Sequence, residues 1–191
     1  MRYFKLIALL LLLCPLTAMA QGQETITRTL EVSADDLSKE AVYLRLEDVD
    51  TFCDVSINGH HVGSTNNRFC RWEWDVKQYL HVGKNTLEGR FQDAVAISEM
   101  AFDKLVTPAP LAGVGEVPHL NLIRKPLYHG GWDWGPKCMS TGFLGTVELI
   151  PVNTARIDYL DCIQDHSVEG QCSLTLKAEV TSPKGGETTL E

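Results

Sequence analysis

The sequence lacks the motifs of several large classes of enzyme and metalloprotein. It contains no Cys-x-x-Cys pair and no glycine-rich loop that could cradle a phosphate group. The adjacent His60 and His61 would point apart on a strand, and no other His, Asp or Glu lies at metal-ligand spacing. Cys138 and His129 could serve as nucleophile and base, but nothing in the sequence orients them. We therefore expect neither a metal nor a cofactor.

Positive charge and long apolar runs are also scarce. The 191 residues hold 17 Lys and Arg against 25 Asp and Glu, a formal net charge of −8, and no basic stripe. After residue 20 no apolar segment reaches the length of a membrane span. Nucleic acid and membranes are therefore not expected partners, whereas an acidic surface is compatible with neutral sugars.

The first twenty residues have the three parts of a secretory signal peptide. Arg2 and Lys5 precede an apolar core at Leu6 to Leu13, and Ala18-Met19-Ala20 supplies small residues for cleavage. We expect residues 1–20 to be removed and the protein to be exported, to the periplasm or outside the cell.

Export would permit disulfides among the cysteines that remain. Cys162 and Cys172 flank a polar turn region and could close a hairpin, and Cys53 with Cys70 could link neighbouring strands. Cys138 would be left over. Buried free thiols are an equally good interpretation of either pair.

The pattern along the chain is that of an all-β protein. Residues 42–46 and 53–57 alternate between apolar and polar side chains, and the second run leads into Asn58-Gly59, a strong hairpin signal. Further strands are expected at residues 61–62, 69–76, 86–91, 145–150, 155–160 and 173–180. Short antiparallel strands between turns predict a jelly roll or β-sandwich.

Two other segments complete the expected organisation. Residues 98–105 are the only plausible helix of any length, and the proline-rich residues 107–126 predict a long ordered loop. A boundary near Pro151 separates a first domain, residues 21–152, from residues 153–191. The latter contain two expected strands, which cannot bury a core alone, and so resemble the opening of a second, incomplete sandwich.

The most informative segment runs from Arg124 to Pro136 and contains Gly-Gly-Trp-Asp-Trp-Gly-Pro. Asp133 lies between Trp132 and Trp134, and glycines and prolines stiffen the segment. Sugars stack their C–H faces on aromatic rings and need fixed partners for their hydroxyls, so this arrangement suits a sugar. A core tryptophan pair capped by a turn aspartate explains the composition equally well.

Five motifs in order resemble the β-mannosidase branch of glycoside hydrolase family 2. They are Asp50-Thr51 with Asn58-Gly59, Asn67-Arg68-Phe69 with Arg71 and Asp75-Val76, Gly83-x-Asn85-x-Leu87, Arg124-Lys125, and Gly131-Trp132-Asp133-Trp134-Gly135-Pro136. The resemblance covers residues from about Val42 to Pro151 and extends to Val180, which would include the start of the following domain. It implies an amino-terminal, galactose-binding-like jelly roll, followed in the family by an immunoglobulin-like sandwich and a catalytic (α/β)8 barrel.

The resemblance also implies roles for individual residues. Asp133 would accept hydrogen bonds from the hydroxyls of a terminal mannose, and Trp132 would form a wall of the site. Arg124 would brace the loop or pair with Asp133. Trp134, Lys125 and His129 would support the loop, and Trp134 would pack inward if the segment is extended.

The sequence departs from the family pattern in three ways. Gly142-Phe143-Leu144 stands where the family usually has Gly-Ile-Trp, and the first strands of the jelly roll are expected to be missing. The family's two catalytic glutamates lie on the barrel, the acid/base after an asparagine, and this sequence has no Asn-Glu dipeptide. The acids Glu47, Asp48, Asp50, Asp54 and Glu73 are expected on solvated strand faces and turns. This chain alone is therefore expected to be inactive.

Three hypotheses follow. The chain is the substrate-facing part of an exported, truncated β-mannosidase that would release terminal non-reducing β-D-mannose with retention and bind a mannose-containing glycan. Alternatively, it is a free-standing carbohydrate-binding module or lectin, or a decayed gene remnant that does not fold.

Overall fold

The computed structural model describes residues 24–106 and 117–185. The expected signal peptide and residues 107–116 of the expected loop lie outside these ranges. The strands are β1 (Glu24–Val32), β2 (Ala41–Leu46), β3 (Val49–Asp50), β4 (Cys53–Ile57), β5 (His60–Thr65), β6 (Trp72–Asp75), β7 (Gly83–Phe91), β8 (Gly142–Phe143), β9 (Val147–Val152), β10 (Arg156–Asp165) and β11 (Ser173–Thr181). The helices are α1 (Ala34–Ser38) and α2 (Ala94–Asp103), with 3-10 turns η1 (Lys77–Tyr79), η2 (Leu120–Leu122) and η3 (Leu127–Gly130).

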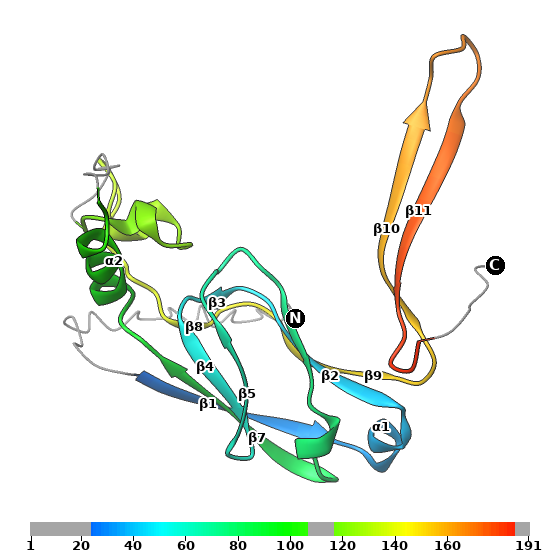
Figure 1. Cartoon of the computed structure of the whole chain (residues 1–191), viewed down its shortest axis with the longest axis horizontal. Coiled ribbons are helices and arrows are strands. Elements are labelled where there is room, and N and C mark those ends of the chain that lie inside the picture. The colour runs from blue at the N-terminus through cyan, green and yellow to red at the C-terminus, as the bar shows by residue number, and fades with distance from the viewer. Residues whose placement is uncertain (1–23, 107–116, 186–191) are drawn as a thin grey trace, which may run out of the picture.

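Two antiparallel sheets form a sandwich (Figure 1). One has the strand order β1-β7-β4-β5 and the other the order β6-β2-β9. The short strands β3 and β8 pair separately, and this pairing brings residues 49–50 beside residues 142–143. The predicted all-β, antiparallel architecture is confirmed.

A single core lies between the two sheets. It combines alternate apolar residues of β2, β4 and β7 with Phe143 of β8, whose ring meets Phe91 edge-on at 5.2 Å between centroids. Trp72 and Trp74 of β6 pack against this core, and the indole of Trp74 lies so close to Gly63 that only glycine fits there. Alternation along β2, β4 and β7 buries one face of these strands, as expected for a sandwich.

Local sequence explains the turns between these strands. Asn58 and Gly59 have positive φ angles of 50° and 82°, which a tight hairpin between β4 and β5 requires. Ser33 and Asp36 form a capping box at the start of α1, and the Asp93 side chain accepts hydrogen bonds from the first turn of α2.

Two sequence-based expectations about the elements need correction, and one strand was not predicted. The strand expected at residues 69–76 begins only at Trp72, because the Asn67 side chain accepts a hydrogen bond from the Phe69 amide and holds residues 67–69 in a turn. The helix begins at Ala94, where Asp93 caps it, and ends at Asp103. Strand β1, which no prediction covered, pairs with β7 along its whole length.

The second segment is a long hairpin, β10–β11, which extends away from the sandwich (Figure 1). Its base is joined to the first domain through Arg156, whose guanidinium forms ion pairs with Glu73 and Asp158 and lies over the Tyr43 ring. Apolar side chains along the hairpin, among them Leu160, are exposed.

Neither of the two disulfides that the sequence left open forms among the described residues. Cys53, Cys70, Cys162 and Cys172 are free thiols, of which only Cys53 is buried. The register pairs Cys162 with Leu176 and Asp165 with Ser173, which places Cys172 beyond the paired part of the hairpin. The Cys162-to-Asp165 offset alone is about 10 Å along the strand, whereas a disulfide needs Cα atoms within about 7 Å.

No helix in the parts of the chain that the structure describes is both long and apolar enough to span a bilayer.

Candidate functional site

The tryptophan motif lies in a segment that leaves the sandwich after η2 and returns at β8. We call residues 124–140 the aromatic loop. Gly131 follows η3 with a φ of 110°, a conformation that favours glycine, and the chain then turns at residues 132–135. Two backbone hydrogen bonds between Trp132 and Gly135, at 3.4 and 3.1 Å, close this turn.

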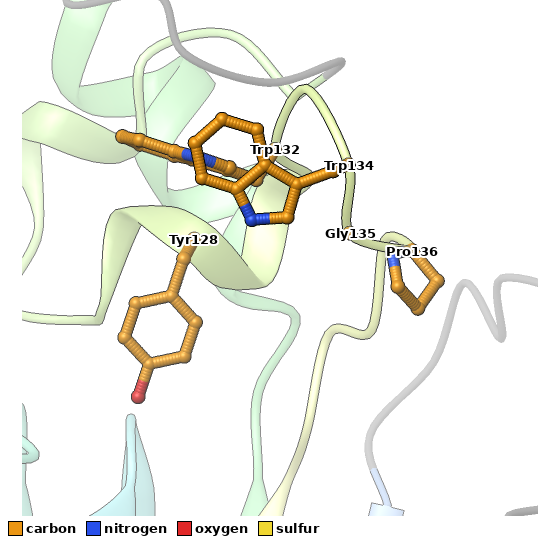
Figure 2. Close-up of a pocket in the computed structure, with 5 residues that line it drawn as sticks. All are labelled: Tyr128, Trp132, Trp134, Gly135 and Pro136. Atoms are coloured by element: carbon orange, nitrogen blue, oxygen red, sulfur yellow. The ribbon is translucent and has the colours of Figure 1, made fainter.

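Three aromatic side chains are exposed on the loop. Tyr128 is 61% exposed, Trp132 41% and Trp134 83%. The two indoles meet nearly at right angles, with centroids 5.8 Å apart (Figure 2). Together with Gly135 and Pro136 they line a hollow of about 490 Å³ whose wall is almost entirely apolar. The interpretation of Trp132 and Trp134 as a core pair is therefore wrong for this chain.

The inward packing predicted for Trp134 is also wrong. That prediction assumed an extended segment, in which neighbouring side chains alternate. The chain turns instead, and the turn brings both indoles to the same surface hollow.

Asp133 and Arg124, the two predicted polar contacts, are both exposed. Within the described residues they form no ion pair with each other. Arg124 acts through its backbone: its carbonyl accepts a hydrogen bond from the Arg68 amide at 3.0 Å, in a parallel bridge between residues 67 and 124. The bracing role of the Arg124 side chain stays a prediction.

Lys125 and His129 are buried residues of the aromatic loop, and they take part in a network around Asp50. The Asp50 side chain is 0% exposed and that of Lys125 1%. Oδ1 of Asp50 accepts from Lys125 Nζ at 2.5 Å and from the Thr51 hydroxyl. Oδ2 accepts from Ser140 Oγ at 2.5 Å and from Arg68 Nη1 at 3.3 Å.

Arg68 extends this network to Asp48 and His129. Its guanidinium forms an ion pair with the Asp48 carboxylate, and Nη1 lies 2.9 Å from Nε2 of His129. A guanidinium only donates hydrogen bonds, so Nε2 accepts and the ring proton belongs on Nδ1. Nδ1 lies 3.1 Å from Ser140 Oγ and 3.6 Å from Oδ2 of Asp50, so a proton on Nδ1 faces these two oxygen atoms.

Burial and partners shift the pKa values of these groups. Burial raises the pKa of Asp50, but hydrogen bonds from Lys125, Ser140 and Thr51 outweigh it and hold that pKa below its ordinary value. Burial lowers the pKa of Lys125, against the opposing effect of the Asp50 carboxylate. Burial, followed by the nearby Lys125 charge, lowers the pKa of His129 and favours the neutral ring.

The position of Asp50 overturns the expectation that it lies on a solvated face. Asp50 is fully buried, and side chains of four residues donate hydrogen bonds to its carboxylate: Thr51, Arg68, Lys125 and Ser140. Asp50, Ser140 and Arg68 were not predicted as site residues. The sequence carried one signal, since Asp50-Thr51 and Asn67-Arg68 both belong to the quoted motifs.

The described residues contain no group of three or more His, Cys, Asp or Glu side chains that could hold a metal ion. The site can therefore offer two things chemically: an apolar aromatic surface with a carboxylate at the adjoining turn, and a rigid ionic base below it.

Residues 16–145 match the protein family described as "Glycosyl hydrolase 2 galactose-binding domain-like". The chain belongs to this family. The resemblance inferred from the five motifs is confirmed, and with it the place of this domain among β-mannosidase-like glycosidases of glycoside hydrolase family 2.

Individual relatives carry β-mannosidase names. The chain is 31% identical over 164 residues to "Beta-mannosidase" of Rattus norvegicus, covering 79% of this chain and 18% of the rat protein. It is 32% identical over 144 residues to "Beta-mannosidase B" of Aspergillus clavatus, covering 74% and 17%. A crystal structure of "Beta-D-Mannosidase" from Dictyoglomus thermophilum superposes with a TM-score of 0.72 at 27% identity, covering 83% of this chain and 19% of that one.

The chain thus spans about a fifth of the length of these family 2 relatives.

Proposed function

We propose that this chain is the substrate-facing, amino-terminal part of an exported β-mannosidase that hydrolyses terminal non-reducing β-D-mannose residues with retention. The observation that carries the proposal is the turn at residues 132–135, which exposes Trp132 and Trp134 around an apolar hollow and keeps Asp133 in solvent. Membership of the family and the β-mannosidase names of the relatives support the same substrate.

The site supplies binding chemistry. An indole face stacks on the C–H face of a pyranose, and a carboxylate accepts hydrogen bonds from its hydroxyls. Retaining hydrolysis needs two carboxyl groups about 5–5.5 Å apart on either side of the scissile bond. In this proposal, a separate catalytic domain supplies both groups. The role of Trp132 and Asp133 is to orient the sugar, and a misplacement of about 1 Å can reduce the rate about a hundredfold.

The test is a kinetic comparison in a full-length β-mannosidase relative. The aspartate that aligns with Asp133 is replaced by alanine, and kcat/KM is measured with an aryl β-D-mannoside. We expect a fall of about a hundredfold with an unchanged thermal unfolding midpoint, since Asp133 is exposed. An unchanged kcat/KM would refute the role given to Asp133.

A second measurement addresses the chain by itself. Mannose and mannobiose are titrated calorimetrically into the protein and its Trp132→Ala variant, with Phe69→Ala as a control that removes an exposed aromatic ring outside the loop. No binding supports a site that is completed by a catalytic domain. Binding that Trp132→Ala abolishes and Phe69→Ala preserves would instead favour a free-standing carbohydrate-binding module.

A further inference from the structure

We infer that Asp50 is a positioning residue: its buried carboxylate ties both ends of the aromatic loop to the sandwich and so fixes where Trp132 and Asp133 stand. The inference rests on the proposed function for its consequence in sugar binding. Its structural content, that Asp50 sets the geometry of the loop, can be tested without any sugar.

The loop meets Asp50 at three points along its length. Lys125 is its second residue, His129 lies within η3, and Ser140 is its last residue. Lys125 donates to Oδ1 of Asp50 and Ser140 to Oδ2, both at 2.5 Å. Lys125 Nζ also donates to the Ser140 carbonyl at 2.7 Å, so the two ends of the loop are joined to each other as well as to the carboxylate.

Asp50 itself is held by the sandwich. It lies on β3, which pairs with β8, and Thr51 continues the chain from β3 into β4. The backbone carbonyl of Thr51 accepts a hydrogen bond from the buried Thr65 hydroxyl of β5 at 2.7 Å. The carboxylate therefore has a fixed origin in the sandwich, and its two oxygens face different parts of the loop.

Backbone hydrogen bonds shape the tip of the loop. Its aromatic side chains point into solvent, and the turn at residues 132–135 is closed by only two backbone hydrogen bonds. A small apolar cluster formed by Val117, Leu120 and Ile123 packs near the start of the loop, with Met139 against it near the end. Backbone hydrogen bonds from the Arg68 amide to the Arg124 carbonyl and from the Cys138 amide to the His129 carbonyl also shape the loop. The side-chain contacts that join both of its ends to β3 are those of the ionic network.

The placement of the buried charges in this network fixes the position of the loop. A buried ion pair adds little net stability compared with a well-packed apolar pair, but each desolvated charge requires a partner in one place. The charged and titratable groups facing Asp50 are Lys125 and His129 from the loop and Arg68 from the segment after β5, which also pairs with Asp48. Any shift of the loop relative to β3 would separate Lys125 and Ser140 from the carboxylate.

The experiment follows the environment of each tryptophan by 19F NMR. The full chain is labelled with 5-fluorotryptophan, and the 19F resonances of its four tryptophans, residues 72, 74, 132 and 134, are assigned by single Trp→Phe variants. Spectra are compared for the unaltered protein, Ser140→Ala and Lys125→Met. The control is Arg45→Met, which removes a half-buried cation from the ion pairs with Glu73 and Glu148 on the other sheet.

We expect the Trp132 and Trp134 resonances to shift or broaden in Ser140→Ala and Lys125→Met, while those of Trp72 and Trp74 stay in place. Amide hydrogen exchange over residues 124–140 should speed up about tenfold relative to that of β4, because hydrogen bonds that fix the loop are lost. Arg45→Met should leave both readouts of the loop unchanged. If Lys125→Met does not fold, Ser140→Ala decides, because it leaves the Lys125–Asp50 ion pair in place.

Two results would overturn the inference: four unshifted resonances in folded Ser140→Ala with unchanged loop exchange, or equal loop shifts in Arg45→Met. Both are independent of sugar binding. A loop that responds as expected, together with an unchanged kcat/KM of the Asp133→Ala variant in the full-length relative, would refute the proposed function only. The reverse result would refute the positioning role only.

Discussion

Nζ of Lys125 lies 2.5 Å from Oδ1 of Asp50 although 75 residues separate the two in sequence, and both side chains are withdrawn from solvent. Above this ion pair, on the same loop, Trp134 is almost fully exposed. The usual distribution of side chains between the interior and the surface is thus inverted over a short distance, since the charged groups are buried and the indoles are exposed. This inversion is what a binding surface on a rigid base requires, because the aromatic groups must meet a ligand and their support must not move.

Removal of the Lys125 charge should strongly destabilise the protein. In Lys125→Met the Asp50 carboxylate stays buried with one fewer cation, and breaking a buried pair in this way costs about 3–5 kcal/mol of unfolding free energy. Urea unfolding measures the change. Lys39→Met is the matched control, since Lys39 forms an exposed pair with Asp35 that is worth about 0–1 kcal/mol. Equal effects of the two substitutions would contradict the account of the network.

Trp134→Ala should leave the stability of the protein nearly unchanged. The side chain is exposed, so the unfolding free energy should change by no more than about 0.5 kcal/mol. Trp74→Ala is the contrasting variant: its indole packs against the core, and its loss should cost up to about 3 kcal/mol. Chemical denaturation of both variants provides the comparison. A large loss of stability in Trp134→Ala would mean that the indole supports the fold.

Much of the sandwich could be predicted from the sequence because its signals are local. Alternating residues in β2 and β4 and the Asn58-Gly59 turn each act within a few positions, and the structure confirms them. Strand β1 was missed although Ile26, Leu30 and Val32 lie on one face, since Arg28 interrupts the apolar series. The pairing of β1 with β7 is a tertiary effect that outweighs this interruption.

The candidate site could be predicted only at its tip. The Trp-Asp-Trp segment is contiguous, so its composition is visible, but its turn geometry and the exposure of Trp134 are not. Asp50 could not be recognised as buried, because its partners Lys125 and Ser140 come from positions 75 and 90 residues away. Burial of a carboxylate depends on donors that the fold assembles, and no local pattern encodes them.

Substitution by alanine should lower the stability of the protein at Gly89 but not at Gly135. A Cβ on the buried Gly89 would lie 2.5 Å from Phe143 Cζ and 2.9 Å from Cys53 Sγ, so Gly89→Ala should cost about 1–3 kcal/mol through overpacking. At Gly135 the nearest atom would be Trp132 Cβ at 3.5 Å, an ordinary contact, so Gly135→Ala should fold with nearly unchanged stability. Thermal unfolding of the two variants distinguishes them. A tolerated Gly89→Ala would show that the core between β7 and β8 is looser than described.

Cysteine reactivity should follow burial. Burial raises the pKa of Cys53 to about 12, so its thiol stays protonated and shielded at pH 8. Cys70, Cys162 and Cys172 are exposed free thiols and should react with iodoacetamide in the native protein. Peptide mass mapping before and after denaturation assigns the labelled sites. Rapid labelling of Cys53 in the native protein, or a Cys162–Cys172 disulfide in the mapped peptides, would contradict this structure.

The network should also make stability depend on pH through His129. Its Nε2 accepts a hydrogen bond from Arg68, so a proton on Nε2 would place two donors and two positive charges against each other. Burial, followed by the charges of Lys125 and Arg68, holds the folded-state pKa of His129 below its ordinary value of 6.5. A group with a lowered folded pKa contributes stability that is fully present above the unfolded pKa and is lost as the pH falls through the folded one.

The unfolding free energy should therefore decline as the pH falls below 6.5, and Asp50, whose folded pKa lies below 3.8, should add a further loss in stronger acid. Urea unfolding at a series of pH values between 4 and 8 follows the first step. His129→Gln keeps an acceptor for Arg68 but cannot titrate, so the slope below pH 6.5 should flatten. His81→Gln is the control, because His81 is exposed and lies outside the network. If His129→Gln retained the full slope, the acid sensitivity would have to arise from other groups, and the ring of His129 would not be held neutral by Arg68 and Lys125.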